Sequence, residues 1–439
     1  MVADGTLSDP RRSVPRTDSV LADPRMVALS ERLGRDRVKA AVVAAQEDVR
    51  AGRLAAETVV ETVLRRVPGT SSSMRPVINA TGVVLHTNLG RAALSRAAVA
   101  AVVAASGNTD VELDLTTGRR SRRGAAAMAA LRSAVPAAGD VHVVNNGAAA
   151  LLLAATALAQ DREIVVSRGE LVEIGDGFRL PDLLVSTGAR LREVGTTNRT
   201  TRADYAAVIT TDTAFVLKVH PSNFVISGFT AGVAVAELAT LPVPVPVVVD
   251  IGSGLLQPDP LLPGEPDATT ALKDGASLVT ASGDKLLGGP QSGMLLGDAA
   301  IVERLRRHPA ARALRVDKLT LAALEATLND ARTPTRAALD VDRASLLSRA
   351  RALADALSAD GVPAEAVPSD GVVGGGGAPG TVLPGAAVAI AEGLAAPLRT
   401  GDPAVLGRVE RGRLLLDLRC VDPASDAAVQ AAVLQAARG

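Results

Sequence analysis

A lysine, a serine three residues before it and several glycines stand together in the stretch Ser282–Pro290, which reads SGDKLLGGP. The stretch follows the apolar segment Ala276–Ala281, so Lys285 is expected on a loop after a buried strand. A lysine that attacks a carbonyl carbon must lose its proton readily, which a partly desolvated setting favours. The pattern therefore predicts Schiff-base chemistry at Lys285, with the Ser282 hydroxyl available for a phosphate. Enzymes with a serine nucleophile share the Ser-x-x-Lys spacing, and many lysines near glycines are simply solvated.

Two features upstream favour the Schiff base. Asp250 ends a run of valines at the carboxyl end of a strand, where α/β sheets place their binding sites. Asn145, Gly147 and Ala148 lie at a turn from a strand to a helix, whose backbone N–H groups can hold a phosphate. A carboxylate can pair with the ring nitrogen of pyridoxal 5′-phosphate (PLP) and make the ring an electron sink. Phosphate turn, aspartate and lysine follow one another as in PLP enzymes of the aspartate-aminotransferase fold, which predicts PLP as the cofactor.

Basic residues and a glycine run form a second group of candidates. Arg312 and Arg315 have the spacing at which two side chains share one helical face and can bind an oxyanion together. Taken alone, this spacing favours a solvated basic face, and Arg91 is an isolated basic residue after a turn. The four glycines Gly374–Gly377 are not followed by a helix with Lys-Ser/Thr, which excludes a P-loop and predicts a flexible turn.

The composition narrows the classes of function. The 439 residues contain 47 Lys and Arg and 47 Asp and Glu, so net charge indicates neither a nucleic acid nor a membrane partner. Four Phe, one Tyr and no Trp argue against extensive stacking on single-stranded bases. The single cysteine, Cys420, excludes an internal disulfide and is expected to be a buried, inert thiol, and no metal site is expected. Without a signal peptide or an apolar run long enough for a membrane, the expected location is the cytoplasm.

Four sections follow from the hydrophobic pattern: a disordered lead-in (1–22), a helical Arg-rich module (23–68), an α/β domain (75–334) and a small α+β domain (335–439). In the α/β domain, valine- and isoleucine-rich runs alternate with helical stretches, which predicts a mainly parallel sheet covered by helices. The expected strands are 141–145, 163–167, 215–219, 247–251 and 292–297, and the expected helices are 148–160, 205–209 and 317–330.

With these residues in place, the chain resembles bacterial selenocysteine synthase, the L-seryl-tRNA(Sec) selenium transferase family. The resemblance runs from about residue 23 to the C-terminus. The matching stretches are Arg75–Ala92, Ser167–Glu173, Glu193–Thr200, Lys218–Phe224, Asp250–Gly254, Ser282–Gly293, Arg312–Leu328 and Gly407–Leu418. The resemblance implies fold type I of PLP-dependent transferases, with a helical N-terminal domain and an α+β C-terminal domain.

The resemblance also implies the reaction. Serine esterified to tRNA(Sec) would displace Lys285 from PLP, Lys285 would remove the Cα proton, and loss of the hydroxyl would give an aminoacrylyl intermediate. Selenium from selenophosphate would add to it and give selenocysteinyl-tRNA(Sec).

Roles for particular residues follow from the same resemblance. Asp284 would be a polar group beside the Schiff base, and His220 would lie near the cofactor or be a satisfied core histidine. The selenophosphate anion would be bound by Arg91, Arg312 and Arg315. The N-terminal module would bind tRNA by its shape and backbone, through Arg32, Arg35, Arg37 and Lys39. The family's assembly would be a homo-oligomeric ring of dimers, a decamer.

The chain departs from the family's usual sequence in two places, and two alternative functions remain open. The stretch Arg119–Ala126 lacks a glycine and a histidine usual in the family, and Gly147 replaces an asparagine, so side-chain contacts at these positions are not carried over. A PLP-dependent lyase acting on a small amino acid or amino sugar phosphate would be expected to lack the helical module at residues 23–68. A non-catalytic tRNA-binding scaffold would have no need of Lys285, Asp250 and Ser282.

Overall fold

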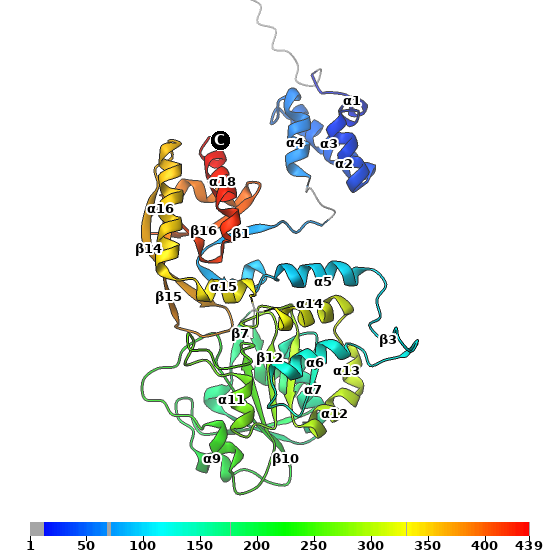
Figure 1. Ribbon diagram of the computed structural model, residues 1–439, viewed down its shortest axis with the longest axis vertical. Coiled ribbons are helices and arrows are strands. Elements are labelled where there is room, and N and C mark those ends of the chain that lie inside the picture. The colour runs from blue at the N-terminus through cyan, green and yellow to red at the C-terminus, as the bar shows by residue number, and fades with distance from the viewer. Residues whose placement is uncertain (1–12, 68–71, 176, 331, 439) are drawn as a thin grey trace, which may run out of the picture. The chain divides into compact units, whose positions relative to one another are not determined.

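The computed structural model describes residues 13–67, 72–175, 177–330 and 332–438, and the chain divides into two units, Met1–Val77 and Ile78–Gly439. The first unit is helical and is drawn in blue in Figure 1. Its helices are α1 (Thr17–Leu21), α2 (Pro24–Leu33), α3 (Arg35–Arg50) and α4 (Val59–Arg66), with a 3-10 turn at Ala56–Thr58. Aliphatic side chains from these helices form a core, in which Met26, Val38, Val42 and Val63 are fully buried.

The start of this unit differs from the expected lead-in over residues 1–22. Residues 1–12 lie outside the described part, but Thr17–Leu21 form helix α1. Val20 and Leu21 are buried in the core of the unit, so the last part of the expected lead-in is ordered by packing. Residues 68–71, where the expected helical module ends, also lie outside the described part.

The second unit contains the expected α/β sheet. Its seven strands are ordered β5-β13-β12-β11-β10-β6-β9, and all are parallel except β13, which is antiparallel to both neighbours. Their bounds are β5 (Asp140–Val144), β6 (Glu163–Ser167), β9 (Arg190–Val194), β10 (Thr213–Val219), β11 (Val247–Gly252), β12 (Leu278–Ser282) and β13 (Gly293–Gly297). The prediction of a mainly parallel sheet is confirmed, and each expected strand lies within two residues of an observed one.

Helices cover both faces of this sheet, because successive residues of each strand point to opposite sides. On one face, Leu217 and Val248 pack with α7 (Gly147–Ala159), and on the other, Val216 and Val249 pack with α6 (Ala125–Ala134). The remaining helices of this part are α5 (Arg96–Ser106), α8 (Leu180–Val185), α9 (Arg202–Ala206), α10 (Val235–Ala239), α11 (Ala268–Lys273), α12 (Ala299–Arg307), α13 (Pro309–Ala313) and α14 (Lys318–Asn329). Two short antiparallel pairs also belong to this part: β3 (Leu113–Asp114) with β4 (Arg119–Arg120), and β7 (Glu173–Gly175) with β8 (Phe178–Arg179).

One helix is displaced from its expected position. The helix predicted at 205–209 is α9, Arg202–Ala206, because Thr201 and Asp204 form a capping box that begins it earlier. The longer helices predicted at 148–160 and 317–330 are α7 and α14, with ends one residue away or less.

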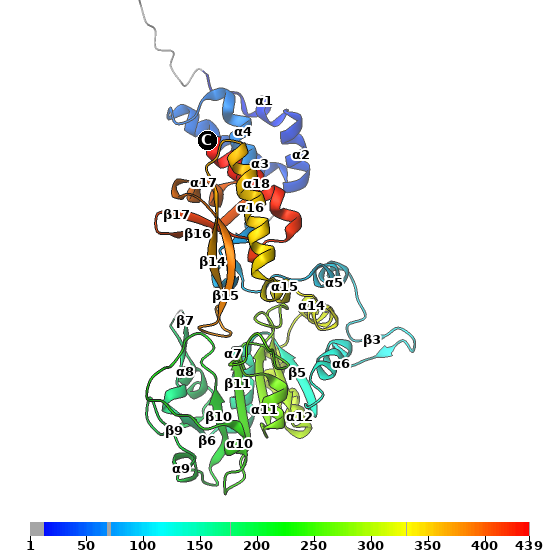
Figure 2. The ribbon, with the colours of Figure 1, turned by 60° about the vertical axis from the view of Figure 1, so that its left-hand side comes forward.

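The C-terminal part is a six-stranded sheet with the order β1-β16-β17-β15-β14-β2. Its strands are β1 (Val77–Ala80), β2 (Val83–Leu85), β14 (Glu365–Gly374), β15 (Val382–Ala391), β16 (Ala404–Glu410) and β17 (Arg413–Asp417). Figure 2 shows α16 (Arg343–Ala359) running along the long strands β14 and β15, and α15 (Pro334–Asp340), α17 (Ala395–Thr400) and α18 (Asp426–Arg438) complete this part. Strands β1 and β2 were expected in the α/β domain, so the boundary at residue 75 needs correction: residues 77–85 pair with the C-terminal strands.

No helix among the described residues is both long enough and apolar enough to cross a membrane.

Candidate active site

Lys285 lies in a cavity of about 660 Å³ at the carboxyl ends of the central strands. Lys285 is 8% exposed, and it lies three residues after Ser282, the last residue of strand β12. Burial lowers the pKa of the Lys285 amine, the nearby Asp250 carboxylate acts in the opposite direction, and the Arg91 charge lowers it further. The setting is therefore the desolvated one that a nucleophilic lysine needs.

Asp250, which lines this cavity, and Thr280 occupy neighbouring parallel strands. They are register partners of β11 and β12, and the Thr280 hydroxyl donates to Asp250 Oδ1 at 2.7 Å. Burial raises the pKa of the Asp250 carboxyl, and this hydrogen bond and the charge of Lys285 oppose the shift. A buried carboxylate with one oxygen fixed by a hydroxyl is suited to pairing with a protonated ring nitrogen.

The start of helix α7 lies against Ser282. Asn146 caps this helix by accepting from Ala149 N–H at 2.8 Å, and Gly147 is its first residue. A Cβ on Gly147 would lie 2.5 Å from Ser282 Oγ, so the absence of a side chain leaves room for the hydroxyl at the helix N-terminus. Helix N-termini bind phosphate through backbone N–H groups, and a nearby hydroxyl adds a donor.

Of the three residues predicted at this turn, Gly147 and Ala148 line the cavity and Asn145 does not. Asn146, Gly147 and Ala148 line the cavity, whereas Asn145 is exposed and is not among the lining residues of the described chain. The backbone N–H of Asn145 donates to the carbonyl of Leu314, which turns this residue away from the cavity. The asparagine that caps α7 is therefore Asn146, the residue that follows Asn145.

Arg91 and Asp284 form an ion pair beside Lys285. Arg91 Nη1 lies 2.8 Å from Asp284 Oδ2, and Arg91 keeps about a third of its side chain exposed (35%). Arg91 has a left-handed backbone conformation (φ 63°), which follows the turn Thr87–Leu89 and directs it to this cavity. A cation with one carboxylate partner and partial exposure is available to an anionic ligand.

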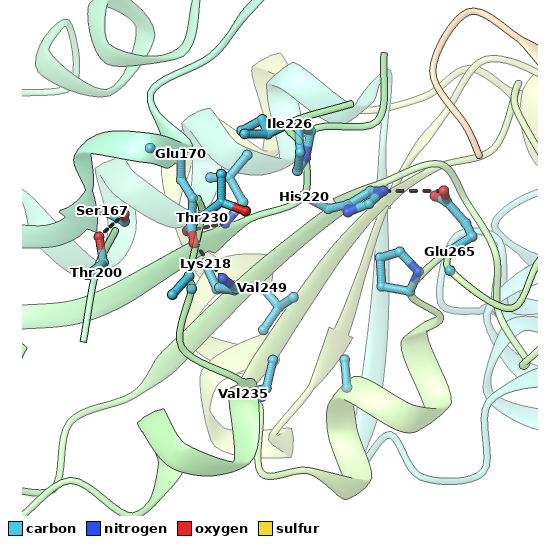
Figure 3. Close-up of a pocket in the computed structure, with 18 of the residues that line it drawn as sticks. Ser167, Glu170, Thr200, Lys218, His220, Ile226, Thr230, Val235, Val249 and Glu265 are labelled. Atoms are coloured by element: carbon cyan, nitrogen blue, oxygen red, sulfur yellow. Dashed lines mark hydrogen bonds and ion pairs between the residues drawn. The ribbon is translucent and has the colours of Figure 1, made fainter. Parts of the chain in front are cut away.

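His220 connects Asp250 to a second acidic side chain. Its backbone N–H donates to the carbonyl of Asp250 at 2.9 Å, and its Nε2 lies 3.2 Å from Glu265 Oε2. Figure 3 draws the contact between His220 and Glu265. His220 lines the cavity of Lys285 as well as a neighbouring cavity of about 640 Å³. Glu265 was not predicted, because an acidic residue between prolines carries no local signal and its partners are distant in sequence.

The neighbouring cavity contains a second, largely buried pair, Lys218 and Glu170, which Figure 3 also draws. Glu170 also accepts from Val219 N–H at 2.9 Å. Its carboxylate thus fixes the end of β10, directly before His220.

Arg312 and Arg315 do not share a helical face. Helix α13 ends at Ala313, and Arg315 forms an isolated backbone bridge with Val144. Both arginines are outside the cavity of Lys285 in the described chain, and Arg315 Nη1 lies 3.7 Å from Glu112. The expected i, i+3 pairing was wrong because Pro309 begins a helix of only five residues.

Comparison with known proteins supplies the family. A family model described as L-seryl-tRNA selenium transferase matches residues 77–422, and one described as selenocysteine synthase N terminal matches residues 11–50. The chain is 43% identical to the L-seryl-tRNA(Sec) selenium transferase of Methylocella silvestris, over 95% of the chain and 96% of the relative. It is 42% identical to that of Moorella thermoacetica, over 98% and 97%. Among solved structures, a D-glucosaminate-6-phosphate ammonia-lyase is similar in fold (TM-score 0.56, 19% identity, 83% of this chain and 96% of that one).

Proposed function

Because the chain belongs to the L-seryl-tRNA selenium transferase family, we propose that it converts L-seryl-tRNA(Sec) to L-selenocysteinyl-tRNA(Sec) in the cytoplasm, with selenophosphate as the selenium donor. The observation that carries this proposal is the cavity in which Lys285, Asp250, Ser282 and Arg91 meet, in a chain that matches the family over almost its whole length.

PLP is the cofactor, and the residues of the cavity fit it. Gly147 and Ser282 hold the phosphate at the start of α7, where a Cβ at 147 would fill the space. Asp250 would hold the ring nitrogen in its protonated form, and Lys285 would be the residue to which the cofactor is attached. When bound, PLP takes up the electron pair that remains at Cα after proton removal.

Lys285, once the α-amine of the substrate has taken its place on the cofactor, would be a free amine and would act as the base at the serine Cα. Because burial lowers the pKa of its amine, a larger neutral fraction is available near neutral pH than for an exposed lysine. The same amine, once protonated, lies in the cavity where the β-hydroxyl leaves and can donate to it. Asp284, paired with Arg91, keeps the guanidinium facing the cavity.

Selenophosphate is an anion, and Arg91 is the residue proposed to bind it within this chain. The guanidinium can donate to phosphate oxygens while it keeps its contact with Asp284. Arg312 and Arg315 lie outside this cavity, so no contact with the anion is assigned to them within it.

The helical unit is proposed to bind the tRNA. Arg32, Arg35, Arg37 and Lys39 are exposed on α2 and α3. Exposed basic side chains on a small helical unit suit the phosphate backbone of a folded RNA. This unit also separates the proposal from a lyase that acts on a free amino acid or sugar phosphate, which has no need of it.

A homo-oligomer built from dimers, a decamer, is proposed for the assembly. Two valines on helix α5 are candidates for a subunit interface, because Val99 is 49% exposed and Val103 is 67% exposed. Light scattering of the full-length protein measures the mass of the assembly, and the mass of ten chains is expected.

Conversion of seryl-tRNA(Sec) tests the function. Full-length protein is incubated with seryl-tRNA(Sec) and selenophosphate, and the amino acid released from the tRNA is identified by mass spectrometry. Wild type is expected to give selenocysteine, and Lys285→Ala none. Absence of selenocysteine with wild type that binds PLP would refute the proposal.

A further inference from the structure

The glycine run Gly374–Gly377 lies against Lys285. A Cβ on Gly376 would lie 2.6 Å from Lys285 Cε and 2.8 Å from Nζ, so the backbone of the run touches the reactive end of the lysine. A Cβ on Gly375 would lie 2.4 Å from Thr87 Cγ2, in the turn that precedes Arg91. The run therefore fills the space between the lysine and the arginine turn. A turn is present at Gly375 and Gly376, as expected from the sequence, and it packs against Lys285.

The run is fixed at its end by a buried carboxylate. Ala378 N–H donates to Glu265 Oε2 at 2.6 Å, and the Glu265 side chain is fully buried (0% exposed). The same oxygen faces His220 Nε2 at 3.2 Å, the contact drawn in Figure 3. Glu265 Oε1 makes no hydrogen bond within the described chain, so Oε2 alone makes both contacts. Two segments that the sequence separates by more than a hundred residues thus meet at one oxygen atom.

We propose that Gly374–Gly377 forms a wall of the active site that confines the Lys285 side chain, and that Glu265 is the positioning residue that holds this wall and His220 in place. The proposal deepens the function proposed above and rests on Lys285 being the reactive lysine. The wall comes from the end of β14 in the C-terminal part, whereas Lys285 and Glu265 come from the α/β part, so the wall joins the two at the reaction centre.

Glycine is required at 376 for two reasons. Its φ of +94° is a conformation that other L-residues rarely adopt, and any Cβ would overlap the Lys285 side chain. The wall also takes water away from the amine, and burial is the largest cause of the lowered pKa of Lys285. Displacing the wall would return water to the amine and raise its pKa toward the ordinary value of about 10.4.

The first test compares two glycine variants of the full-length protein. Gly376→Ala introduces the overlap with Lys285, whereas Gly361→Ala introduces the same kind of backbone strain (φ +86°) with nothing within 4 Å of the new Cβ. The pKa of Lys285 is measured in cofactor-free protein by competitive acetylation across pH, read by mass spectrometry of the lysine-containing peptide. Gly376→Ala is expected to raise this pKa and Gly361→Ala to leave it unchanged. An unchanged Lys285 pKa in folded Gly376→Ala, or an equal rise in both variants, would overturn the proposal.

The second test removes the anchor. Glu265→Ala deletes the acceptor of Ala378 N–H, and Glu265→Gln keeps an oxygen that can accept it. Hydrogen exchange of the peptide that spans residues 374–380 is expected to be about 10- to 100-fold faster in Glu265→Ala. Hydrogen exchange in Glu265→Gln is expected to stay near that of wild type. Both variants remove the Glu265 charge, which raises the Lys285 pKa, so the effect of the wall is seen as a Lys285 pKa that is higher in Glu265→Ala than in Glu265→Gln.

Equal exchange in wild type and Glu265→Ala, or faster exchange in Glu265→Ala with a Lys285 pKa no higher than in Glu265→Gln, would contradict the wall. These measurements need no turnover. Failure of selenocysteine formation in wild type would refute the proposed function, whereas the wall stands or falls on the acetylation and exchange results alone.

Discussion

The contact between Gly147 and Ser282 allows a quantitative test of the phosphate site. A methyl group on Gly147 would lie 2.5 Å from Ser282 Oγ but 3.8 Å from its Cβ. Gly147→Ala is therefore accommodated only if the Ser282 hydroxyl rotates away from the start of α7, and with it from the phosphate. Ser282→Ala removes the same hydroxyl directly and also removes the overlap.

The magnitude follows from one hydrogen bond to a charged group, about 1.5–3 kcal/mol. Each single variant is expected to weaken PLP binding by about 10- to 100-fold, since about 1.4 kcal/mol corresponds to a factor of ten. The double variant is expected to lose no more than either single one, which makes the coupling energy as large as one single loss. Alanine is the better helix former, so Gly147→Ala is not expected to lower the free energy of unfolding of the cofactor-free protein.

The assay is titration of cofactor-free protein with PLP, followed by absorbance, for wild type, both single variants and the double variant. Gly107→Ala serves as control, because a Cβ at that position meets nothing within 4 Å. Two additive losses would refute the shared hydroxyl, and normal PLP affinity in Gly147→Ala would refute the placement of the phosphate.

Four further predictions concern the site and the helical unit. Asp250→Asn is expected to bind PLP but to lower kcat by about 100-fold or more, measured as selenocysteine formed per enzyme, because the neutral amide cannot stabilise a protonated ring nitrogen. Because burial lowers the Lys285 pKa, the unfolded chain binds more protons than the folded chain at pH values between the folded and unfolded pKa. The free energy of unfolding of cofactor-free wild type, relative to that of Lys285→Met, is therefore expected to rise with pH through this window and to level off above about 10.4. Chemical denaturation at several pH values measures this difference. Arg91→Ala is expected to raise the KM for selenophosphate about 10-fold or more and to leave PLP affinity unchanged by titration. Arg32→Glu with Arg35→Glu is expected to weaken tRNA binding and to flatten its dependence on salt, with PLP affinity as the control.

The strands around the site were predictable because their burial on both faces requires continuous apolar runs. Val247–Gly252 reads as such a run, and Asp250 stands out in it as the one charged residue, so its position at the cavity followed from the sequence. Strand β14 was not predicted, because its buried positions include Ser369 and Gly371, so the sequence shows no alternation of apolar and polar residues, and it contains a proline. It pairs with β15 as a hairpin and with the distant strand β2, and the second contact has no local signal.

The parts of the site that escaped prediction depend on contacts between distant segments. Glu265 meets Ala378 across 113 residues, and no spacing rule relates the two. The glycine run was interpreted as a flexible turn because glycine permits many conformations, whereas here it also permits the closest approach of a backbone to Lys285. Composition alone does not distinguish these two uses of glycine.

The stretch that contains Arg312 and Arg315 resembles the family, and its backbone supports the active site although it does not line the cavity. The carbonyl of Leu314 accepts from Asn145 N–H, and Arg315 bridges Val144, so this segment pairs with the end of β5. The end of β5 leads directly into Asn146, which caps α7 and sets the first helix residue at the proposed phosphate site. The backbone of residues 314 and 315 therefore supports the phosphate turn, while the two guanidinium groups are left outside the cavity. It follows that charge-removing substitutions at 312 and 315 should leave PLP affinity unchanged, whereas a proline at 315, which would distort the bridge to Val144, should weaken it.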